Sequence, residues 1–155
     1  MGRYAVMHQT PAGATLTLIN LTGGTTIRAN IYDFMIGSDA TPADFAGEFV
    51  ICRSTSTGTI DGGGATLAEN PLDPLTVAAT AAGLGGTFGT PPTVGGPPVT
   101  TPLLMLGLNQ RATFRWVAAP GSELITAATA SNGIAVHSVG HGGTPNMNLT
   151  LYWFE

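Results

Sequence analysis

Charged residues are scarce in this chain, and lysine is absent. Only 9% of the 155 residues are Asp, Glu, Lys or Arg, whereas an ordinary soluble domain has about 25%. The absence of lysine excludes a phosphate-binding P-loop, a Schiff-base enzyme and a lysine general base. With so few charges, much of the surface must consist of Thr, Gly, Pro, Ala and large hydrophobic residues, which is tolerable where other protein covers it. The sequence therefore predicts a subunit of a larger assembly.

Further absences narrow the class of protein. No run is apolar over the length that spans a bilayer, and the first residues lack the apolar stretch of a signal peptide. We therefore expect no membrane contact and synthesis in the cytoplasm. The net charge is −4 and there is no basic run, which argues against nucleic-acid binding. The single cysteine, Cys52, excludes an intrachain disulfide, and its apolar neighbours predict a buried thiol rather than a reactive one.

Glycine and proline divide the chain into short runs that resemble β-strands. The 22 glycines and 11 prolines separate segments rich in Thr, Val, Ile, Leu and aromatic residues, a pattern typical of all-β domains. We expect a single all-β domain over residues 1–155, a β-sandwich of about eight antiparallel strands for which the jelly roll is a natural arrangement. The expected strands lie within residues 14–21, 26–36, 48–53, 99–106, 110–118, 124–127, 133–139 and 146–154.

Alternation in two of these segments predicts which side chains face the core. Phe114 and Trp116 share one face of their strand, and Arg111 and Arg115 share the other. This pattern favours core aromatics and surface or interface arginines over nucleic-acid stacking. Beyond Tyr32, hydrophobic residues occupy both faces, so either a β-bulge shifts the register or both faces are buried there.

Two segments between the strands have signals of their own. Asp73 followed by Pro74 resembles a helix cap with a first-turn proline, which predicts a short helix over residues 74–82. Residues 83–98 are rich in glycine and proline. They predict a long loop, or an extended arm that packs on a neighbouring subunit.

No pattern of residues predicts catalysis, a cofactor or a metal. The glycines of residues 83–89 do not have the spacing of a dinucleotide-binding loop. His137 and His141 would lie about 13 Å apart on a strand, too far to share a metal ion unless a turn at Gly140 brings them together. Residues 61–64 contain one carboxylate among glycines, which favours a turn over a calcium site. We therefore expect no enzyme, no cofactor and no metal site.

Several segments carry a resemblance to a known class of proteins. The longest is NQRATFRWVAAPGSEL at residues 109–124, followed by ASNGI at 130–134. MGRY at residues 1–4, RANIYD at 28–33 and TPAD at 41–44 are similar to the same class. Together they resemble small virion proteins of tailed bacteriophages. The resemblance covers most of the chain but not residues 83–98.

The resemblance implies a structural role on the outside of a capsid. Proteins of this class are often jelly-roll or related β-sandwich domains, and several are cement or decoration proteins that sit as trimers where subunits of the major capsid protein meet. It implies a homotrimer on the capsid exterior, made in the host cytoplasm, without cofactor or catalytic residues. The expected contact surfaces are the apolar residues around 32–36, the arginine face of 110–118 and the arm at 83–98. The candidate contact residues are Tyr32, Phe34, Met35, Arg111, Arg115, Phe88 and Val94.

Other readings remain open at this point. One is a different virion or tail component. Another is a glycan- or receptor-binding β-sandwich, for which Tyr4, Tyr32, Tyr152 and Trp153 are available. The third is a jelly-roll enzyme of the cupin type. An assay that finds no metal bound to the purified protein would exclude this function.

Overall fold

A computed structural model describes residues 1–11, 16–39, 41–62, 64–94, 102–141 and 143–155. The described residues form strands and turns and contain no helix. The strands are β1 (Arg3–Pro11), β2 (Leu16–Thr22), β3 (Asn30–Ser38), β4 (Ala46–Ser54), β5 (Thr59–Ile60), β6 (Ala65–Leu67), β7 (Asn70–Pro71), β8 (Ala82–Gly85), β9 (Phe88–Thr90), β10 (Pro102–Asn109), β11 (Thr113–Val117), β12 (Leu124–Ile125), β13 (Gly133–His141) and β14 (Asn146–Phe154).

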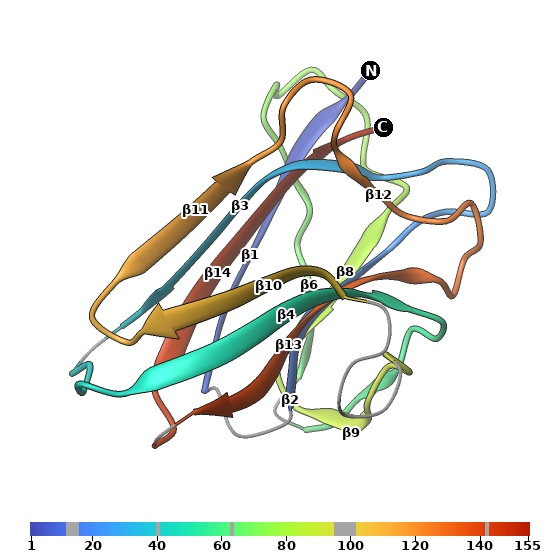
Figure 1. Cartoon of the computed structure of the whole chain (residues 1–155). Helices are drawn as coiled ribbons and strands as arrows, with labels where there is room; N and C mark the ends of the chain where they lie inside the picture. Colours follow the sequence, from blue (N-terminus) through green and yellow to red (C-terminus); the bar gives the residue numbers. More distant parts are fainter. Residues whose placement is uncertain (12–15, 40, 63, 95–101, 142) are drawn as a thin grey trace.

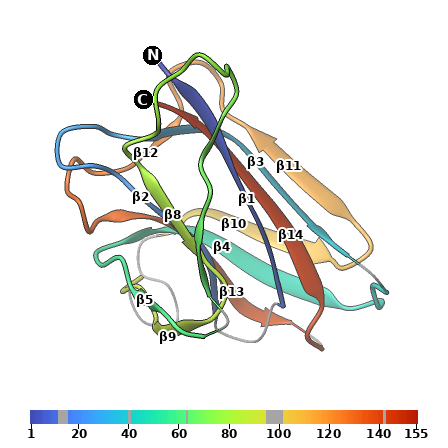
Figure 2. The same cartoon turned by 180° about the vertical axis from the view of Figure 1, so that it is seen from behind.

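Two antiparallel sheets pack face to face (Figure 1). The first, here called the β3 sheet, has the strand order β11-β3-β14-β1-β7, and β12 pairs with the end of β3. The second, the β4 sheet, has the order β10-β4-β13-β2-β8-β6. Strands β5 and β9 pair with each other beside the β4 sheet, as the view from behind shows (Figure 2). The all-β sandwich that the sequence predicts is confirmed.

The core lies between the two sheets because each long strand turns alternate apolar residues inward. In β14 the buried residues are Met147, Leu149, Leu151 and Trp153, and the residues between them face outward. The Trp153 ring stacks on Tyr4 of β1 with 5.5 Å between the ring centroids. Strand β1, which the sequence pattern did not reveal, pairs with β14 along its whole length. Both ends of the chain are thereby held at one end of the β3 sheet.

A β-bulge interrupts β3 at Tyr32. Tyr152 of β14 is opposite Asp33, but the next residue of β14 is opposite Ile31, so Tyr32 is the extra residue. Ile31 is buried before the bulge and Phe34 after it, although their parity differs. Of the two alternatives that the sequence left open, the bulge is therefore correct. Its consequence is that Tyr32 and Asp33 both lie on the outer side of the sheet.

The segment expected as a free arm is packed on its own molecule as far as it is described. β8 pairs with both β2 and β6, and β9 pairs with β5. Further along, Val94 is only 8% exposed and packs with Val50, Cys52 and Ala135 on the outer side of the β4 sheet. The prediction of a loop or arm is wrong for residues 83–85 and 88–90, because three strand pairings hold them. Residues 91–94 lie outside the strands, but the apolar contact of Val94 packs them on the same molecule. Residues 95–98 lie outside the described part.

The helix expected over residues 74–82 is absent. The Asp73 carboxylate accepts a hydrogen bond from the Leu75 amide at 3.0 Å, and its carbonyl accepts one from the Thr76 amide at 2.9 Å. These contacts make a turn with Pro74 at its second position, a conformation that uses the same Asp-Pro chemistry as a helix start. Leu75 and Val77, the large apolar residues of this segment, are exposed, so burial of their side chains does not favour a helix here.

Candidate functional site

The candidate site lies on the outer side of the β3 sheet, the side that faces away from the core. Strand alternation and the bulge place side chains from four strands there, and we call this surface the outer β3 face. One row of residues crosses the four neighbouring strands of this sheet. In strand order, the row consists of Arg115 of β11, Met35 of β3, Thr150 of β14 and Met7 of β1. The outer β3 face is the part of this side formed by Arg3, Met7, Tyr32, Asp33, Met35, Arg115, Val117, Thr150, Tyr152 and Phe154. The same side continues toward the other end of the sheet with the polar residues Gln9, Asn148 and Thr113.

Three aromatic rings lie next to one another on this face. The Tyr32 ring is 6.3 Å from that of Tyr152 and 6.2 Å from that of Phe154, measured between centroids. All three side chains are half-buried. Burial raises the pKa of Tyr32, although the nearby Arg3 guanidinium lowers it, so the phenol stays a neutral hydrogen-bonding group. Tyr32 is the bulge residue, and it lies on the outer side of the sheet although Phe34, two residues later, points into the core.

An ion pair adjoins the aromatic rings. The Arg115 Nε lies 3.0 and 3.2 Å from the two carboxylate oxygens of Asp33, and Nη2 also donates to Oδ2. The Asp33 side chain is only 6% exposed and that of Arg115 is 59% exposed. The hydrogen bonds and charge of Asp33 raise the pKa of Arg115. The pair thus holds a fixed guanidinium whose outer side remains open to a partner.

A small cavity of about 230 Å³ lies at the end of the outer β3 face, where Arg3 and Phe154 line it. The loop after β11 forms one wall and is anchored by the Ala118 amide, which donates to the Tyr32 carbonyl at 2.8 Å. The Glu123 carboxylate accepts a hydrogen bond from the Gly121 amide at 3.2 Å. The lining residues are Arg3, Tyr32, Ala118, Pro120, Glu123 and Phe154.

The structure brings together three of the predicted contact residues and separates the others. Tyr32, Met35 and Arg115 share the outer β3 face. Phe34 is 0% exposed in the core, so its prediction as a contact residue is wrong, because the bulge reverses the parity on which it rested. Val94 is also buried, against its own sheet. The remaining two are Arg111, exposed in the turn before β11, and Phe88, half-buried on β9.

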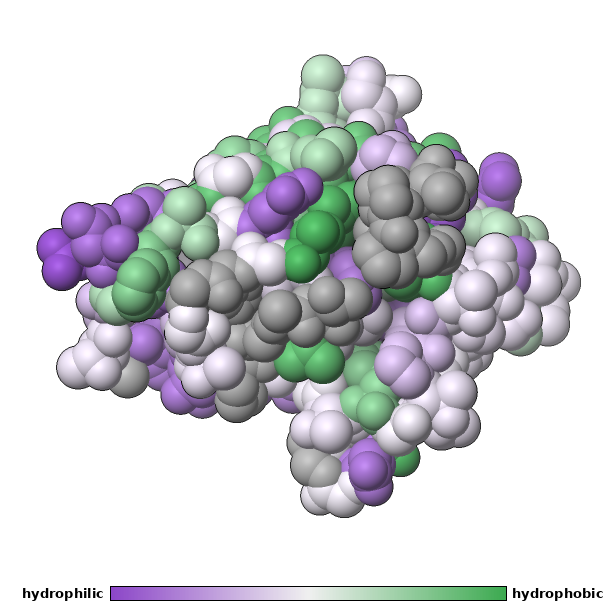
Figure 3. Space-filling view, turned by 60° about the horizontal axis from the view of Figure 1, so that its bottom comes forward, coloured by the Kyte–Doolittle hydropathy of each residue, from purple (hydrophilic) through white to green (hydrophobic). Residues whose placement is uncertain are grey.

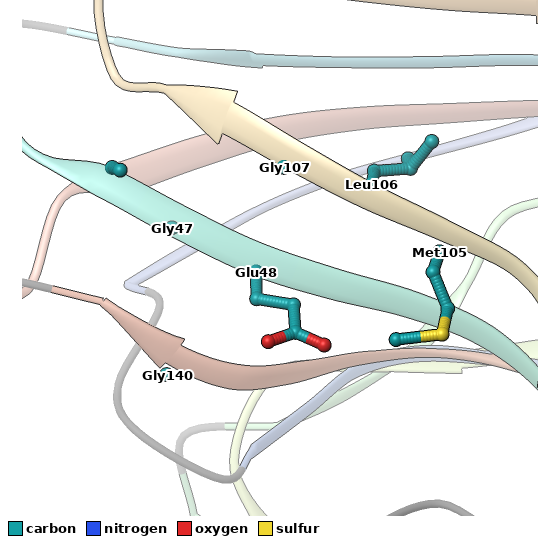
Figure 4. A pocket seen from close by; sticks show the side chains of 7 residues that line it. Gly47, Glu48, Met105, Leu106, Gly107 and Gly140 are labelled. Carbon is teal, nitrogen blue, oxygen red and sulfur yellow. The ribbon is translucent and has the colours of Figure 1, made fainter.

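The β4 sheet carries a shallow groove of about 440 Å³ on its outer side (Figure 4). Glu48 of β4 has a glycine opposite it on each neighbouring strand, Gly107 of β10 and Gly140 of β13. A methyl group added to either glycine would meet nothing within 4 Å. The glycines therefore leave an open floor, and Met105, 59% exposed, stands beside it.

Few charged residues are available for the surface, and uncharged and apolar residues make up much of it (Figure 3). Figure 3 shows white and green areas over much of one face, with purple confined to smaller patches. The exposed large hydrophobic residues of the described chain are Met1, Met7, Leu16, Ile27, Phe45, Leu72, Leu75, Val77, Met105 and Val117. Met7 and Val117 belong to the outer β3 face, in addition to its aromatic rings. Met105 lines the groove on the β4 sheet, and Phe45 lies beside it.

The imidazoles of His8 and His137 lie in buried surroundings. The His137 Nδ1 lies 3.1 Å from the Thr17 hydroxyl, and burial lowers the pKa of this imidazole. Burial also lowers the pKa of His8, whose Nε2 lies buried. Within the described ranges, His, Cys, Asp and Glu form no group of three that could hold a metal ion. The side chain of His141 lies outside the description.

Sequence reasoning missed the two carboxylates that shape the site. Asp33 and Glu123 become visible only when β3 is paired with β11 and the loop after β11 returns to the bulge. Tyr152 and Phe154 could be found from the alternation of residues 146–154, which assigns them to the face opposite Trp153.

Comparisons with known proteins add no relative. Among the described residues no helix is long and apolar enough to cross a membrane. No protein-family model matches the chain, and no curated protein and no solved structure is similar to it.

Proposed function

We propose that this chain is a structural virion protein that binds the outer surface of a tailed-phage capsid as a homotrimer, in the manner of a cement or decoration protein. Its partner is the major capsid protein, and it carries out no catalysis. The observation that carries the proposal is the make-up of the outer β3 face. Aromatic residues, methionine and arginine dominate that face, and these are the residue types enriched where proteins bind one another.

The outer β3 face is built to hold its shape before a partner arrives. Its side chains stand on four paired strands, and the Asp33 carboxylate fixes the Arg115 guanidinium. A rigid surface loses little conformational entropy when it docks, so more of the contact energy appears as affinity. Three such faces on one trimer act together, which raises the avidity for a repeating shell.

The proposed mechanism is stabilisation by mass action. A protein that binds the assembled shell but not free capsid subunits lowers the free energy of the shell, in proportion to the logarithm of its concentration over its dissociation constant. This mechanism needs surface contacts and no reactive group. The ion pair and aromatic rings of the outer β3 face are suited to such contacts.

The strand order supports a jelly roll as the arrangement of the sandwich. The eight long strands have the order β11-β3-β14-β1 in one sheet and β10-β4-β13-β2 in the other. Along the chain they alternate between the sheets, except that β4 and β10 follow one another in the same sheet. The first and last of them, β1 and β14, are neighbours. Two interleaved Greek keys would give this order.

Co-sedimentation with expanded capsids of the tailed phage that carries this sequence tests the proposal. We expect the chain to pellet with the shells, and Tyr152→Ser to weaken binding roughly tenfold or more because it removes a central ring of the outer β3 face. Val77→Ser is the matched control, because Val77 is exposed but lies outside that face. A chain that pellets with tails and not with shells would be another virion component, and wild-type binding by Tyr152→Ser would overturn the assigned face.

A second candidate function is glycan binding, and the cavity beside Tyr32 favours it. Tyr32 and Phe154 present ring surfaces, while Arg3 donates and Glu123 accepts hydrogen bonds. A sugar ring can stack on the aromatics while its hydroxyls use both polar groups. A panel of neutral oligosaccharides tests it: binding that Tyr32→Ala abolishes would favour this function, and no binding at millimolar concentration would remove it.

A further inference from the structure

The groove on the outer side of the β4 sheet presents one unpaired charge on an open floor. Glu48 is exposed, and no described side chain or main-chain group makes a hydrogen bond or ion pair with its carboxylate. Gly107 and Gly140 flank it, so no side chain from a neighbouring strand covers it (Figure 4). Met105 supplies an apolar wall. A fitting occupant would combine an apolar side chain with a cation.

The same molecule displays that combination at the end of the groove. Phe45, 50% exposed, precedes the first residue of β4, and Arg111 lies exposed in the turn that follows β10. We call this pair of residues the corner. Ala46 and Asn109 are opposite one another in the sheet, so the corner adjoins the groove. Among the described residues no ion pair engages the Arg111 side chain.

Hydrogen bonds hold the corner in place from beneath. The Gln110 amide donates to the Phe45 carbonyl at 3.0 Å, and the Asn109 side chain donates to the Asp44 carboxylate at 2.8 Å. Asn109 also accepts a hydrogen bond from the Arg111 amide at 2.9 Å. The backbone of the corner is therefore preorganised, while the ring and the guanidinium project from it.

We infer that the groove binds the corner of a second copy of this chain. Phe45 of one copy lies against Met105 of the next, and Arg111 pairs with Glu48. Glycine at 107 and 140 leaves the room that a bulky ring needs. This contact rests on the homotrimer of the proposed function, and the groove and the corner would form the interface between its subunits.

A threefold axis suits the placement of the two surfaces. Because the corner and the groove adjoin on one protomer, each copy beside such an axis can give its corner to one neighbour and accept a corner from the other. Three identical contacts then close the ring. The outer β3 face belongs to the other sheet and stays free for the capsid.

Charge exchange between the two positions tests this contact. The mass in solution is measured by light scattering over a range of concentrations for wild type, Glu48→Arg, Arg111→Glu and the double variant. We expect the wild type to be trimeric and each single variant to raise the dissociation constant roughly tenfold or more, because two like charges then meet. The double variant restores opposite charges and should return to within about threefold of wild type.

Two more variants control for folding and for charge alone. Gly107→Leu fills the groove at a position where nothing lies within 4 Å of the first added carbon, and it should dissociate the trimer while circular dichroism still shows a folded β-sheet protein. Arg28→Glu reverses an exposed charge that lies outside the groove, the corner and the outer β3 face, and it should leave the mass unchanged.

The outcomes separate this inference from the proposed function. Single variants that remain as trimeric as wild type would overturn the corner-to-groove contact and leave a trimer formed by other surfaces. A wild-type dimer would overturn the threefold closure. A wild-type monomer that still pellets with capsids would overturn self-association while the capsid contact stands.

Discussion

Replacement of Val94 by alanine tests whether the segment after β9 is packed on its own sheet. Val94 lies 8% exposed against Val50, Cys52 and Ala135 on the outer side of the β4 sheet. The change removes two methyl groups from that contact. At about 0.8 kcal/mol for each buried carbon, with a further cost for the cavity, the loss is about 2 kcal/mol.

The Cys52 thiol gives a direct readout of that loss. Burial raises the pKa of Cys52 to about 11, so at pH 8 the closed form holds little of the reactive thiolate. A thiol reagent therefore labels the protein through openings that expose Cys52. A destabilisation of about 2 kcal/mol raises the open population about 30-fold, and the labelling rate should rise by up to the same factor.

Urea unfolding measures the global part of the effect. With a slope of about 2 kcal/mol per molar urea, the unfolding midpoint should fall by about 1 M if Val94 belongs to the cooperative core. A faster labelling rate with an unchanged midpoint would mean that the segment opens locally. Either result agrees with the packed segment that the structure shows.

A matched control removes the same two methyl groups where they are not buried. Val77 is 79% exposed, and Val77→Ala should change neither the labelling rate nor the midpoint. If Val94→Ala behaves like this control in both assays, the segment is not packed on the β4 sheet and the reasoning is refuted.

Three further predictions concern pH, backbone space and the ion pair. Burial lowers the pKa of His8 and His137 below the usual 6.5, so the unfolded chain binds more protons below pH 6.5. The free energy of unfolding from urea titrations should therefore fall as the pH drops below 6.5, by at most about 1.4 kcal/mol per pH unit for each histidine. Gly133→Ala should destabilise the chain by about 1–3 kcal/mol in the same assay, because the added carbon would lie 2.4 Å from a main-chain oxygen of β2. Arg115→Lys should lower the thermal midpoint, because an ammonium group does not reproduce the two-nitrogen contact with Asp33.

Each of these predictions has a control within the chain. His137→Gln should flatten the pH dependence, and an unchanged profile would show that this histidine does not carry it. Gly107→Ala should be neutral because nothing lies within 4 Å of the added carbon. Arg111→Lys should leave the midpoint unchanged, and a fall equal to that of Arg115→Lys would contradict the special role of the ion pair.

The predictable parts of the fold are those with clean alternation. Phe114 and Trp116 pack against the core, and residues 146–154 form a strand with Trp153 inside, as the sequence predicts. The sequence does not predict strand β1, because two of its inward positions hold the polar residues His8 and Thr10 instead of apolar ones. Polar residues at inward positions remove the contrast on which a period of two depends.

Other errors arose where one local signal serves two structures. Asp73 with Pro74 suits a turn as well as a helix start, and burial of the large apolar side chains here does not favour the helix. Residues 83–94 read as an arm because the partners of β8 and β9 are distant in the sequence.

The candidate site was predictable only in part for a related reason. Arg115 follows from strand parity, but parity alone does not separate Tyr32 and Met35 on the outer β3 face from Phe34 in the core, because a bulge exchanges the two faces. Asp33 finds its partner only through the pairing of β3 with β11.

Electron cryomicroscopy of expanded capsids incubated with the chain would show directly whether the chain binds the shell as a trimer. We expect density of threefold symmetry on the outer surface of the shell, large enough for three chains of 15.7 kDa, with the outer β3 face against the capsid. Bare shells at saturating concentrations of the chain, or density with the outer β3 face turned away from the capsid, would contradict the proposed function.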